Sequence, residues 1–466
     1  MKPVFLLTDL ILFVMVGVTI AYVLHVRATP HLRATWGKAF HSPMGACTAT
    51  LLALFLLVGL LDSVHYRPLL EDSTASTPAY SPATRSMLDL LLSTQEASRE
   101  KNYSAPLAWR SFDREGMVRD GHAVRDYPRL AHGGVHLDDP ETQWAGDVIR
   151  RGLAGVAGGV LAAMALAAIC AALLARHDGS DIQTAWIRIA QRRTWFPIRP
   201  VIIMLAIVLV IAGPIVSWAQ VYHVFGTDRV GTDLLYVVMK AIRTAVVIGT
   251  MTTLVTLPFA VGLGIMAGYL RGWVDEVIQY VYTVINSIPY VLTIAAAVLI
   301  LMVFIDNNPQ LFQTSAERTD ARLFFLCVIL GMTSWTELCR LIRGEVLKLR
   351  ELDYVQAAQA FGVSNWRIMV VHLLPNVVHL ILINIVISFS GLVLAEAVLS
   401  YIGVGVDPAM ASFGTLINTA RLELSREPAV WWTLATAFTF MFTLVLSANL
   451  FADAVRDAFD PRAIHR

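Results

Sequence analysis

The stretch from Gly344 to Asn376, GEVLKLRELDYVQAAQAFGVSNWRIMVVHLLPN, is a polar segment between two long apolar ones. Several of its apolar residues recur at the spacing of one helix face: Leu352, Val355, Ala358 and Phe361. Gly362 follows them and suits the left-handed backbone conformation that ends a helix. The pattern predicts two short helices joined at this glycine.

Polar residues at the two helix starts predict how these helices are capped. Asp353 is placed to cap the first helix, and Gln356, three residues later, can bond back to its amide in a capping box. Ser364 can cap the second helix. Pro375 is expected to limit that helix, because proline has no amide hydrogen to donate.

This segment resembles the EAA loop of ABC-importer permeases. The resemblance rests on Gln356-Ala357-Ala358, then Gly362, then Leu374-Pro375, and His372 resembles the dipeptide, oligopeptide and nickel branch. In that family the loop is a cytoplasmic coupling helix that docks in a cleft of an ATPase subunit. The ATPase-coupling residues that the resemblance implies are Asp353, Gln356, Ala357, Ala358, Phe361, Gly362, His372 and Pro375.

One position of the segment departs from the family pattern. Gln356 stands where the family has a glutamate, so a favourable charge interaction with the helix dipole, about 0.3–1 kcal/mol, is lost. Any ion pair between that glutamate and an ATPase arginine is lost with it. Without the motifs further along the chain, the segment would fit an ordinary capped surface loop equally well.

Composition indicates a membrane protein. Of the 466 residues, 56% are hydrophobic and 15% are charged, whereas a soluble domain carries about 25% charged residues. The net charge of +1 gives no indication of nucleic-acid binding. Four cysteines lie at no metal or disulfide spacing and are predicted to be small core residues: Cys47, Cys170, Cys327 and Cys339. No small-residue cleavage site follows the first apolar run, which predicts a retained helix.

We predict an all-α, polytopic membrane bundle of about nine spans, each near the ~20 residues that a bilayer requires. The predicted spans are residues 4–25, 44–64, 152–175, 200–222, 243–270, 277–305, 322–343, 377–400 and 430–452. If the coupling loop is cytoplasmic, the short loops 26–43 and 176–199 are cytoplasmic too. Their basic residues agree with the positive-inside rule: Arg27, Arg33, Lys38, Arg176, Arg188, Arg192, Arg193 and Arg199. The N-terminus then lies outside and the C-terminus in the cytoplasm, with Arg150 and Arg151 as weak exceptions.

The chain divides into four predicted regions. They are two N-terminal transmembrane helices (1–64), a periplasmic insertion (65–146), a third helix with a cytoplasmic linker (147–199), and a type I ABC-importer permease core (200–466) that contains the coupling loop (345–376). The insertion is polar and proline-containing, which fits either a small subdomain or a partly disordered segment. Its His122, His132 and His136 fit no standard metal spacing, so we predict no metal site.

From about residue 200 onward the chain resembles the permease family throughout. Phe225-Gly226-Thr227-Asp228, followed by Gly231 and Asp233, resembles an outer-side segment of the family in which Thr232 replaces an arginine. This spacing of Gly and Asp predicts a tight turn that enters a capped helix. Contact with a binding protein or a gate is the alternative. The residues of this periplasmic motif are Gly226, Thr227, Asp228 and Asp233.

Two places within apolar spans are candidates for the translocation path. Asn286 and Ser287 precede Pro289, and a proline bend survives in a membrane only where neighbours or a wet cavity satisfy the freed carbonyls. Glu396 lies in the run Ala395–Pro408, which resembles the peptide-permease pattern, and an ionisable group in a span usually faces protein or water. Packing of bent helices explains both places as well.

The sequence contains no GxxxxGK[ST] phosphate loop, so we expect ATP and magnesium on partner subunits and no catalytic residue here. The resemblance implies four partners in a bacterial inner membrane: a second homologous permease, two ABC ATPases and a periplasmic solute-binding protein. It implies import of peptides or peptide-like solutes, with nickel chelates, opines or other small solutes as alternatives. An ATP-independent transporter, which would show paired broken helices in two repeats, and a membrane sensor are the alternatives from other classes.

Overall fold

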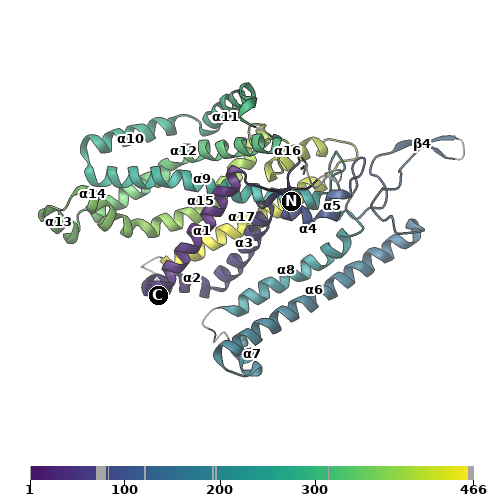
Figure 1. The fold of residues 1–466 in the computed structure, drawn as a ribbon, viewed down its shortest axis with the longest axis horizontal. Helices are drawn as coiled ribbons and strands as arrows, with labels where there is room; N and C mark the ends of the chain where they lie inside the picture. The colour runs from purple at the N-terminus through teal and green to yellow at the C-terminus, as the bar shows by residue number, and fades with distance from the viewer. Residues whose placement is uncertain are drawn as a thin grey trace, which may run out of the picture.

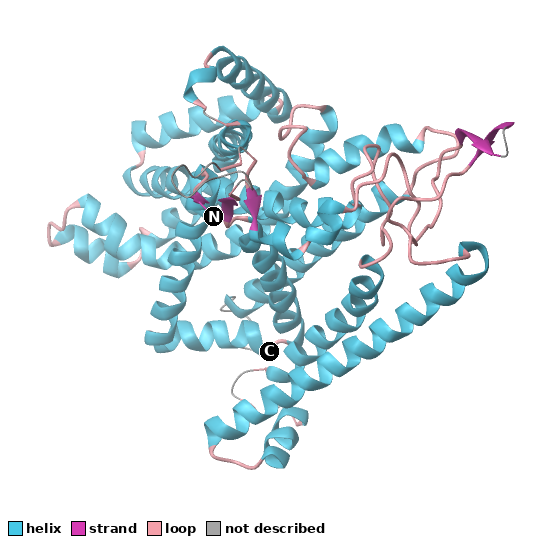
Figure 2. Cartoon of the chain, turned by 45° about the vertical axis from the view of Figure 1, so that its right-hand side comes forward, coloured by secondary structure: helices cyan, strands magenta, loops and turns pink. Residues whose placement is uncertain are grey.

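The computed structural model describes residues 2–69, 80–81, 83–119, 122–191, 194, 197–312 and 314–459. Helices dominate this part of the chain, and its strands are few and short (Figure 2). Nine of its helices are long and apolar enough to cross a membrane, which confirms an all-α, multi-pass fold. They are α1 (Leu7–Ala28), α3 (Pro43–Asp62), α6 (Pro140–Asp178), α8 (Ile198–Ala219), α9 (Leu234–Leu270), α11 (Tyr290–Asn307), α12 (Ser315–Leu349), the stretch Asn365–Ile402, and α17 (Trp432–Phe459). The predicted cytoplasmic residues Arg192 and Arg193 lie outside the described residues.

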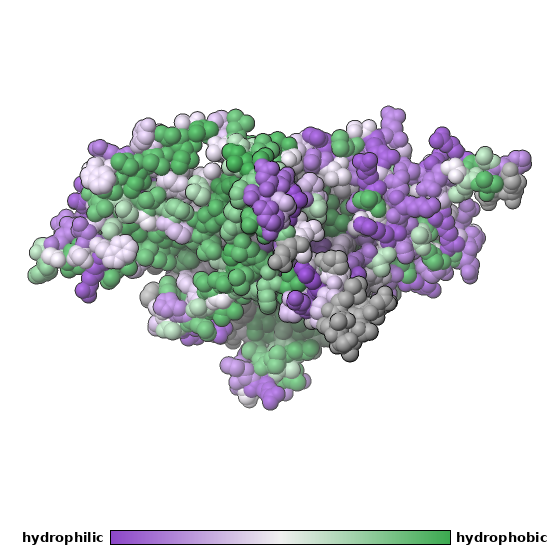
Figure 3. Space-filling view, turned by 45° about the horizontal axis from the view of Figure 1, so that its top comes forward, coloured by the Kyte–Doolittle hydropathy of each residue, from purple (hydrophilic) through white to green (hydrophobic). Residues whose placement is uncertain are grey.

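Shorter elements gather at the two ends of this bundle (Figure 1). One end, called the insertion end here, carries β1 (Lys2–Val4), β2 (His65–Arg67), β3 (Arg85–Ser86), α4 (Met87–Leu91), α5 (Ser93–Ala97), β4 (Glu115–Arg119), β5 (His122–Asp126) and α16 (Phe413–Leu424). The other, the coupling end, carries α2 (Pro30–His41), α7 (Ile182–Ala190), α13 (Asp353–Ala360) and α14 (Asn365–Arg367). Apolar side chains cover the surface between the two ends, where a bilayer would lie (Figure 3).

The strands form two small antiparallel units at the insertion end. β2 pairs with β1 on one side and with β3 on the other, so the chain start and the insertion share one sheet. β4 and β5 form a separate hairpin that projects from the molecule (Figure 1). The described part of the insertion is therefore folded, as one of the two sequence-based alternatives supposed.

Helix α9 forms the centre of the bundle and packs along α12. Glycines allow this close contact: a Cβ atom added at Gly268 would lie 2.7 Å from the Cβ atom of Val346. The pair α6 and α8 lies beside the bundle, and these two helices also approach each other closely at glycines (Figure 1). There a Cβ atom at Gly159 would lie 2.4 Å from the carbonyl oxygen of Leu209, which confirms the small-residue packing typical of membrane helices.

The predicted single span 277–305 is wrong. The structure divides it into α10 (Gly272–Ser287) and α11, with Pro289 at the cap of α11. Ile288 adopts an extended backbone, φ −91° and ψ 132°, because a residue before proline is driven out of the helical region. Proline thus breaks the helix here instead of bending it.

A buried charge network joins the N-terminal helix α1 to the bundle at the insertion end. Arg243 of α9 donates from Nε to Asp9 Oδ1 at 3.2 Å and from Nη2 to Thr8 Oγ1 at 3.0 Å. Asp320 of α12 accepts from the Thr8 amide at 3.1 Å, and His65 Nδ1 lies 2.7 Å from Asp9 Oδ2. A buried ion that loses its partner is strongly destabilising, so this network fixes α1 against α9 and α12.

A second polar contact fastens the insertion to the same helix. Lys240 of α9 lies 2.8 Å from Asp89 of α4, and the hydroxyl of Tyr236 donates to the same carboxylate at 2.9 Å. Ser86 donates to Asp62, at the end of α3, at 2.7 Å. The insertion is thereby held to the outer part of the bundle by hydrogen bonds and charge.

Candidate functional site

The short helix α13 lies in the segment that the sequence marks as a coupling loop. It begins at Asp353, and Leu352 occupies the N-cap position with an extended backbone, φ −77° and ψ 141°. The predicted capping box is therefore wrong: Asp353 is already helical, and Gln356 Nε2 donates to the carbonyl of Glu351 at 3.2 Å instead. In the first turn, the Asp353 carboxylate still interacts favourably with the helix dipole.

The predicted glycine stop at the end of α13 is confirmed. Gly362 has φ +73°, and its amide donates to the carbonyl of Gln359 at 3.0 Å. The amide of Val363 donates to the carbonyl of Ala358, also at 3.0 Å. These two bonds form a Schellman motif, which reverses the chain within one turn. An added Cβ atom at Gly362 would meet nothing within 4 Å, so backbone conformation alone requires glycine.

One side of α13 is anchored to the bundle. Val355 is fully buried, and Ala358 packs against the same apolar cluster. The hydroxyl of Tyr269, at the end of α9, accepts from Gln359 Nε2 at 3.2 Å and donates to Asn365 Oδ1 at 3.1 Å. Because these contacts come from both sides of the turn, α13 and α14 are fixed to the end of a central helix.

The other side of this segment exposes large apolar side chains. Phe361 is 86% exposed and Trp366 is 71% exposed, and Ala357 is exposed beside them. The predicted single apolar face is thus divided, because α13 ends at Ala360 and Phe361 lies beyond it. Exposed apolar groups gathered on a fixed turn are typical of a protein-binding surface.

Beyond the turn, the chain continues as one helical stretch from Asn365 to Ile402. Ser364 occupies the predicted N-cap, without a side-chain hydrogen bond. The expectation that Pro375 limits a helix is wrong, because a π-helical run, η2 (Ile368–Leu373), precedes it and Pro375 lies in the first turn of α15 (Leu374–Ile402). A π-helical turn widens the backbone locally and so accommodates a residue without an amide hydrogen.

His372 lies within this π-helical run and is half-buried. Its ring is 6.4 Å from that of Tyr354 on α13, and the Tyr354 hydroxyl accepts from Asn376 Nδ2 at 3.1 Å. The residues implied by the resemblance lie on α13, on the turn after it, on η2 and at the start of α15: Asp353, Gln356, Ala357, Ala358, Phe361, Gly362, His372 and Pro375.

Polar groups also meet next to the break at Pro289. Asn286 Oδ1 accepts from the hydroxyl of Thr336 at 3.0 Å, whereas Ser287 bonds within its own helix, to the carbonyl of Val284. The next residue of α12, Glu337, borders a cavity of about 50 Å³ between α9, α12 and α15. Its polar lining residues are Thr253, Thr256, Ser334, Glu337, Asn384 and Ser388.

The sequence reasoning named none of these six lining residues. Glu337, Asn384 and Ser388 all lie in apolar spans, and Ser388 donates to Asn384 Oδ1 at 3.1 Å. The signal that could have found Glu337 was present, since an ionisable residue inside a span is a functional candidate by default.

Glu396 occupies a different environment from Asn286. It is buried, and its Oε1 accepts from the hydroxyl of Ser400 at 2.6 Å. A Cβ atom added at Gly414 of α16 would lie 3.0 Å from the same oxygen. Glu396 thus holds the end of α15 against the start of α16, an arrangement that favours the packing alternative.

The outer motif before α9 lies beneath the insertion. The hydroxyl of Thr227 donates to the carbonyl of Asn102 at 3.0 Å and accepts from the amide of Ser104 at 2.7 Å. Gly231 has φ +76°, and an added Cβ atom would lie 1.9 Å from the carbonyl oxygen of Glu100. Gly226 likewise has a positive φ, +78°. The motif forms the predicted turn, and its inner residues face the insertion.

Two acidic residues complete this turn. Asp228 Oδ1 accepts from the amide of Thr232 at 2.8 Å and closes the loop. Asp233 caps α9, since its Oδ1 accepts from the amide of Leu235 at 2.8 Å, and its Oδ2 lies 2.8 Å from His223 Nδ1. This confirms the predicted capped helix entry.

His223 forms a charged bridge between the bundle and the insertion. Its Nδ1 faces Asp233 and its Nε2 lies 3.3 Å from Glu100, which also accepts amide bonds from residues 131–133. Burial alone would lower the pKa of His223, but the two carboxylates raise it to about 9. Burial alone would raise the pKa of Glu100, but the hydrogen bonds from His223 and the amides lower it to about 2. His223 and Glu100 are therefore both charged at neutral pH.

Of the three histidines singled out in the insertion, His136 forms an ion-pair contact within the chain. His136 Nε2 lies 2.8 Å from Asp147, which also binds Arg150 and Arg151 at 2.7 and 2.9 Å. These ion pairs account for two basic residues that depart from the positive-inside rule. Among the residues that the structure describes, no group of three or more His, Cys, Asp or Glu side chains is arranged to hold a metal ion.

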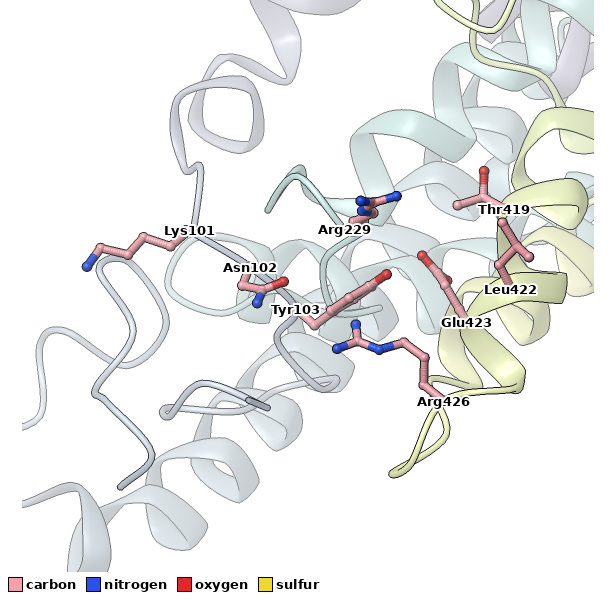
Figure 4. A pocket seen from close by; sticks show the side chains of 8 residues that line it. All are labelled: Lys101, Asn102, Tyr103, Arg229, Thr419, Leu422, Glu423 and Arg426. Atoms are coloured by element: carbon pink, nitrogen blue, oxygen red, sulfur yellow. The ribbon is translucent and has the colours of Figure 1, made fainter. Parts of the chain in front are cut away.

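A recess of about 540 Å³ opens at the insertion end (Figure 4). It is lined by Lys101, Asn102, Tyr103, Arg229, Thr419, Leu422, Glu423 and Arg426, from the insertion, the outer motif and α16. The Arg426 guanidinium lies 4.6 Å from the Tyr103 ring centroid. Glu423 is buried, and burial raises the pKa of its carboxyl group. The insertion therefore shapes the outer surface together with the bundle.

Comparison with known proteins finds similarity to components of transport systems. Residues 260–465 match the family model described as binding-protein-dependent transport system inner membrane component. The chain is 33% identical over 241 residues to the dipeptide transport system permease protein DppC of Lactococcus lactis, which is 52% of this chain and 64% of that protein. It is 29% identical over 239 residues to the oligopeptide transport system permease protein OppC of Mycobacterium bovis, covering 51% of this chain and 76% of that one.

A third relative differs in the substrate that its name states. The chain is 29% identical over 242 residues to the glutathione transport system permease protein GsiD of Pectobacterium atrosepticum, covering 52% of this chain and 73% of that protein. Each match covers about half of this chain and 64% to 76% of the relative. The family model begins at residue 260, so α1 to α8 and the insertion lie outside it.

Proposed function

We propose that this chain is the permease subunit of an ATP-driven importer. The proposal is supported by the match of residues 260–465 to the model of binding-protein-dependent transport inner membrane components, by the similarity to peptide permeases, and by the nine apolar helices among the described residues. In this proposal the chain forms one half of a translocation path. A second, related permease forms the other half, two ATPase subunits supply the energy, and a solute-binding protein delivers the cargo.

The observation that carries the proposal is the surface around α13. It combines a helix fixed by Tyr269 and Val355 with the exposed side chains of Phe361 and Trp366. A docking element has to meet both conditions, because force passes through a contact only if the element cannot move independently of the spans. The rings then supply the apolar anchors on which most interface affinity depends.

The anchoring indicates how motion would reach the membrane. α13 contacts the end of α9 through Tyr269 and continues, through Gly362 and the π-helical run, into α15. If ATP binding draws two ATPase subunits together, the docked segment moves with them, and α9 and α15 follow as connected levers. Rocking of the spans would then alternate access to the path.

The polar group beside Pro289 is the proposed path lining. Asn286 lies just before the break between α10 and α11, and broken helices at mid-membrane depth are typical of substrate sites in transporters. Glu337 borders the nearby cavity between α9, α12 and α15. Glu396 is proposed to hold α15 and α16 in position. The coupling end then faces the cytoplasm of a bacterial inner membrane, and both the N-terminus and the insertion face outward.

The proposed cargo is a peptide or a peptide-like solute. The names of the relatives support this proposal, since they are dipeptide, oligopeptide and glutathione transport permeases. Nickel chelates, opines and other small solutes are the alternative class of cargo.

The proposal is tested by capturing the tagged, full-length chain from membranes of its own host and identifying the subunits that accompany it. We expect ATP-hydrolysing subunits in the wild-type capture. Ala357→Glu places a charge on the exposed surface of α13 and should lower their recovery at least about tenfold, the effect of about 1.4 kcal/mol.

Gly344→Val is the matched control, because Gly344 lies on α12 near the same end and an added Cβ atom there meets nothing within 4 Å. It should retain the ATPase subunits. Wild-type captures that lack any ATPase, or equal recovery with Ala357→Glu, would overturn the proposed coupling role.

A further inference from the structure

A groove of about 860 Å³ lies at the coupling end, between α1, α2 and α17. Its apolar wall includes Val23 and Val26 of α1 and Phe451 of α17. None of these helices forms part of the surface around α13, and α1 and α2 lie outside the region that matches the family model. The groove is therefore a feature of the added N-terminal helices where they meet the permease core.

Aromatic contacts give the groove a fixed shape. Trp36 of α2 donates from its indole nitrogen to the hydroxyl of Tyr22 on α1 at 3.1 Å. The Trp36 ring lies 5.3 Å from that of Phe459 on α17, edge to face, and the rings of Phe40 and Phe451 are 6.1 Å apart. Trp and Tyr are enriched where membrane helices meet the lipid headgroups, so the groove opens at that depth.

Helix α2 has the character of an interfacial helix. It runs for 12 residues between two spans, buries Ala39, and exposes Arg33 and Lys38. Figure 1 shows α1 and α2, both purple, beside the C-terminal end of the molecule. A short helix with one apolar side and cationic side chains on the other lies in the plane of a membrane surface.

The charges around the groove are of one sign. Arg27, Arg33 and Lys38 line it together with His41. Among the described residues, those that line the groove include no Asp or Glu. A cavity with an apolar floor and a cationic rim, placed at the membrane surface, complements a ligand with acyl chains and a negative headgroup.

We propose that this groove binds an anionic diacyl phospholipid. One acyl chain lies against Val23, Val26 and Phe451, and the phosphate of the headgroup is bound by Arg27 and Lys38. The lipid fills the wedge between the added helices and α17. This site is independent of the proposed transport function, because it requires neither ATPase subunits nor cargo.

The experiment uses the full-length chain, reconstituted in vesicles of equal parts phosphatidylglycerol and phosphatidylcholine, then extracted in mild detergent for native mass spectrometry. The wild type should retain phosphatidylglycerol in several-fold excess. Arg27→Gln with Lys38→Gln should lower that excess to about equal retention of the two lipids, since each cation near the membrane surface contributes about 1 kcal/mol. Arg176→Gln with Arg188→Gln removes the same charge on α6 and α7, at the same end, and should leave the excess unchanged.

A second pair of variants tests the groove itself without altering charge. Gly37 of α2 lines the groove, whereas Gly17 of α1 does not. An added Cβ atom at either glycine meets nothing within 4 Å. Gly37→Leu should fill the groove and reduce retained lipid of both kinds, whereas Gly17→Leu should not. An unchanged lipid ratio in the charge variant, equal retention of the two lipids by the wild type, or equal behaviour of the two leucine variants would overturn the proposal.

Discussion

The two ends of this molecule are built on opposite principles. At the insertion end, charged groups are buried and paired: Arg243 with Asp9, and His223 with Glu100 and Asp233. At the coupling end, apolar rings are exposed, and Phe361 has lost little of its contact with solvent. Buried charges are stabilised by their pairing within the chain. Exposed apolar rings become favourable only when another protein surface covers them.

The comparison shows which end of the molecule needs no partner protein to complete its contacts. The insertion end pairs buried charges such as Arg243 and His223 within the chain, so it behaves as part of the folding unit. The coupling end leaves large apolar side chains such as Phe361 and Trp366 exposed for a partner protein to cover. Substitutions at the insertion end should therefore change stability, whereas those at the coupling end should change assembly.

The largest expected effect is that of Arg243→Ala. The change leaves Asp9 and Asp320 buried without their cation, which costs roughly 3–5 kcal/mol of unfolding free energy. Thermal unfolding of the purified chain in detergent measures it. Arg176→Ala, at an exposed site on α6, is the control and should leave the midpoint unchanged. Equal unfolding midpoints for the two variants would contradict the claim that buried charge pairs at the insertion end stabilise the fold.

A smaller effect separates two glycines with almost the same backbone. Gly231 and Gly362 have φ of +76° and +73°, so alanine costs a similar backbone strain of about 1–2 kcal/mol at each. An added Cβ atom is crowded by Glu100 at Gly231 but meets nothing at Gly362. Gly231→Ala should therefore destabilise by at least about 1 kcal/mol more, the usual cost of overpacking. Identical unfolding midpoints for the two alanine variants would show that Glu100 of the insertion does not crowd position 231.

The bridge at His223 should make the insertion end sensitive to alkaline pH. A histidine with a raised pKa stabilises the fold fully below its unfolded value of about 6.5, and this contribution is lost as pH rises through about 9. We expect the wild type to lose on the order of 1–3 kcal/mol between pH 7 and pH 10. His223→Gln should remove that part of the pH dependence. A wild type and a variant with parallel pH profiles would contradict the charged bridge.

The smallest effect on stability is expected at Phe361. Phe361→Ser removes an exposed ring and should change the unfolding free energy by less than about 0.5 kcal/mol. Its effect on partner binding should be large, since truncation of an apolar anchor costs about 2 kcal/mol or more. Parallel measurements of unfolding and of ATPase recovery separate the two. A strongly destabilised variant would show that Phe361 belongs to the core.

Local patterns in the sequence predicted much of this architecture. Hydropathy placed eight of the nine spans close to their observed positions, and Gly362 and Asp233 stop and start helices as expected. These features depend on a few neighbouring residues. Where two local signals competed, the prediction failed: Leu352 rather than Asp353 is the N-cap, and Pro375 is accommodated by a π-helical turn that no simple spacing predicts.

Contacts across the sequence were beyond the same reasoning. Asp9 meets Arg243 across 234 positions, and Thr227 meets Asn102 across 125. No periodicity links such residues, because their pairing is decided by how the helices pack. Glu337 could have been noticed as an ionisable group in a span, but its neighbours Asn384 and Ser388 become a group only once α15 lies against α12.

The central claim is that the surface around α13 docks on an ATPase subunit, and a photo-crosslinking amino acid at position 361 tests it directly. The matched probe replaces Val118, which is also highly exposed but lies on the hairpin at the insertion end. After illumination of host membranes, the account predicts an adduct between position 361 and an ATP-hydrolysing subunit, and none from position 118. An ATPase adduct at position 118, or none at position 361, would contradict it.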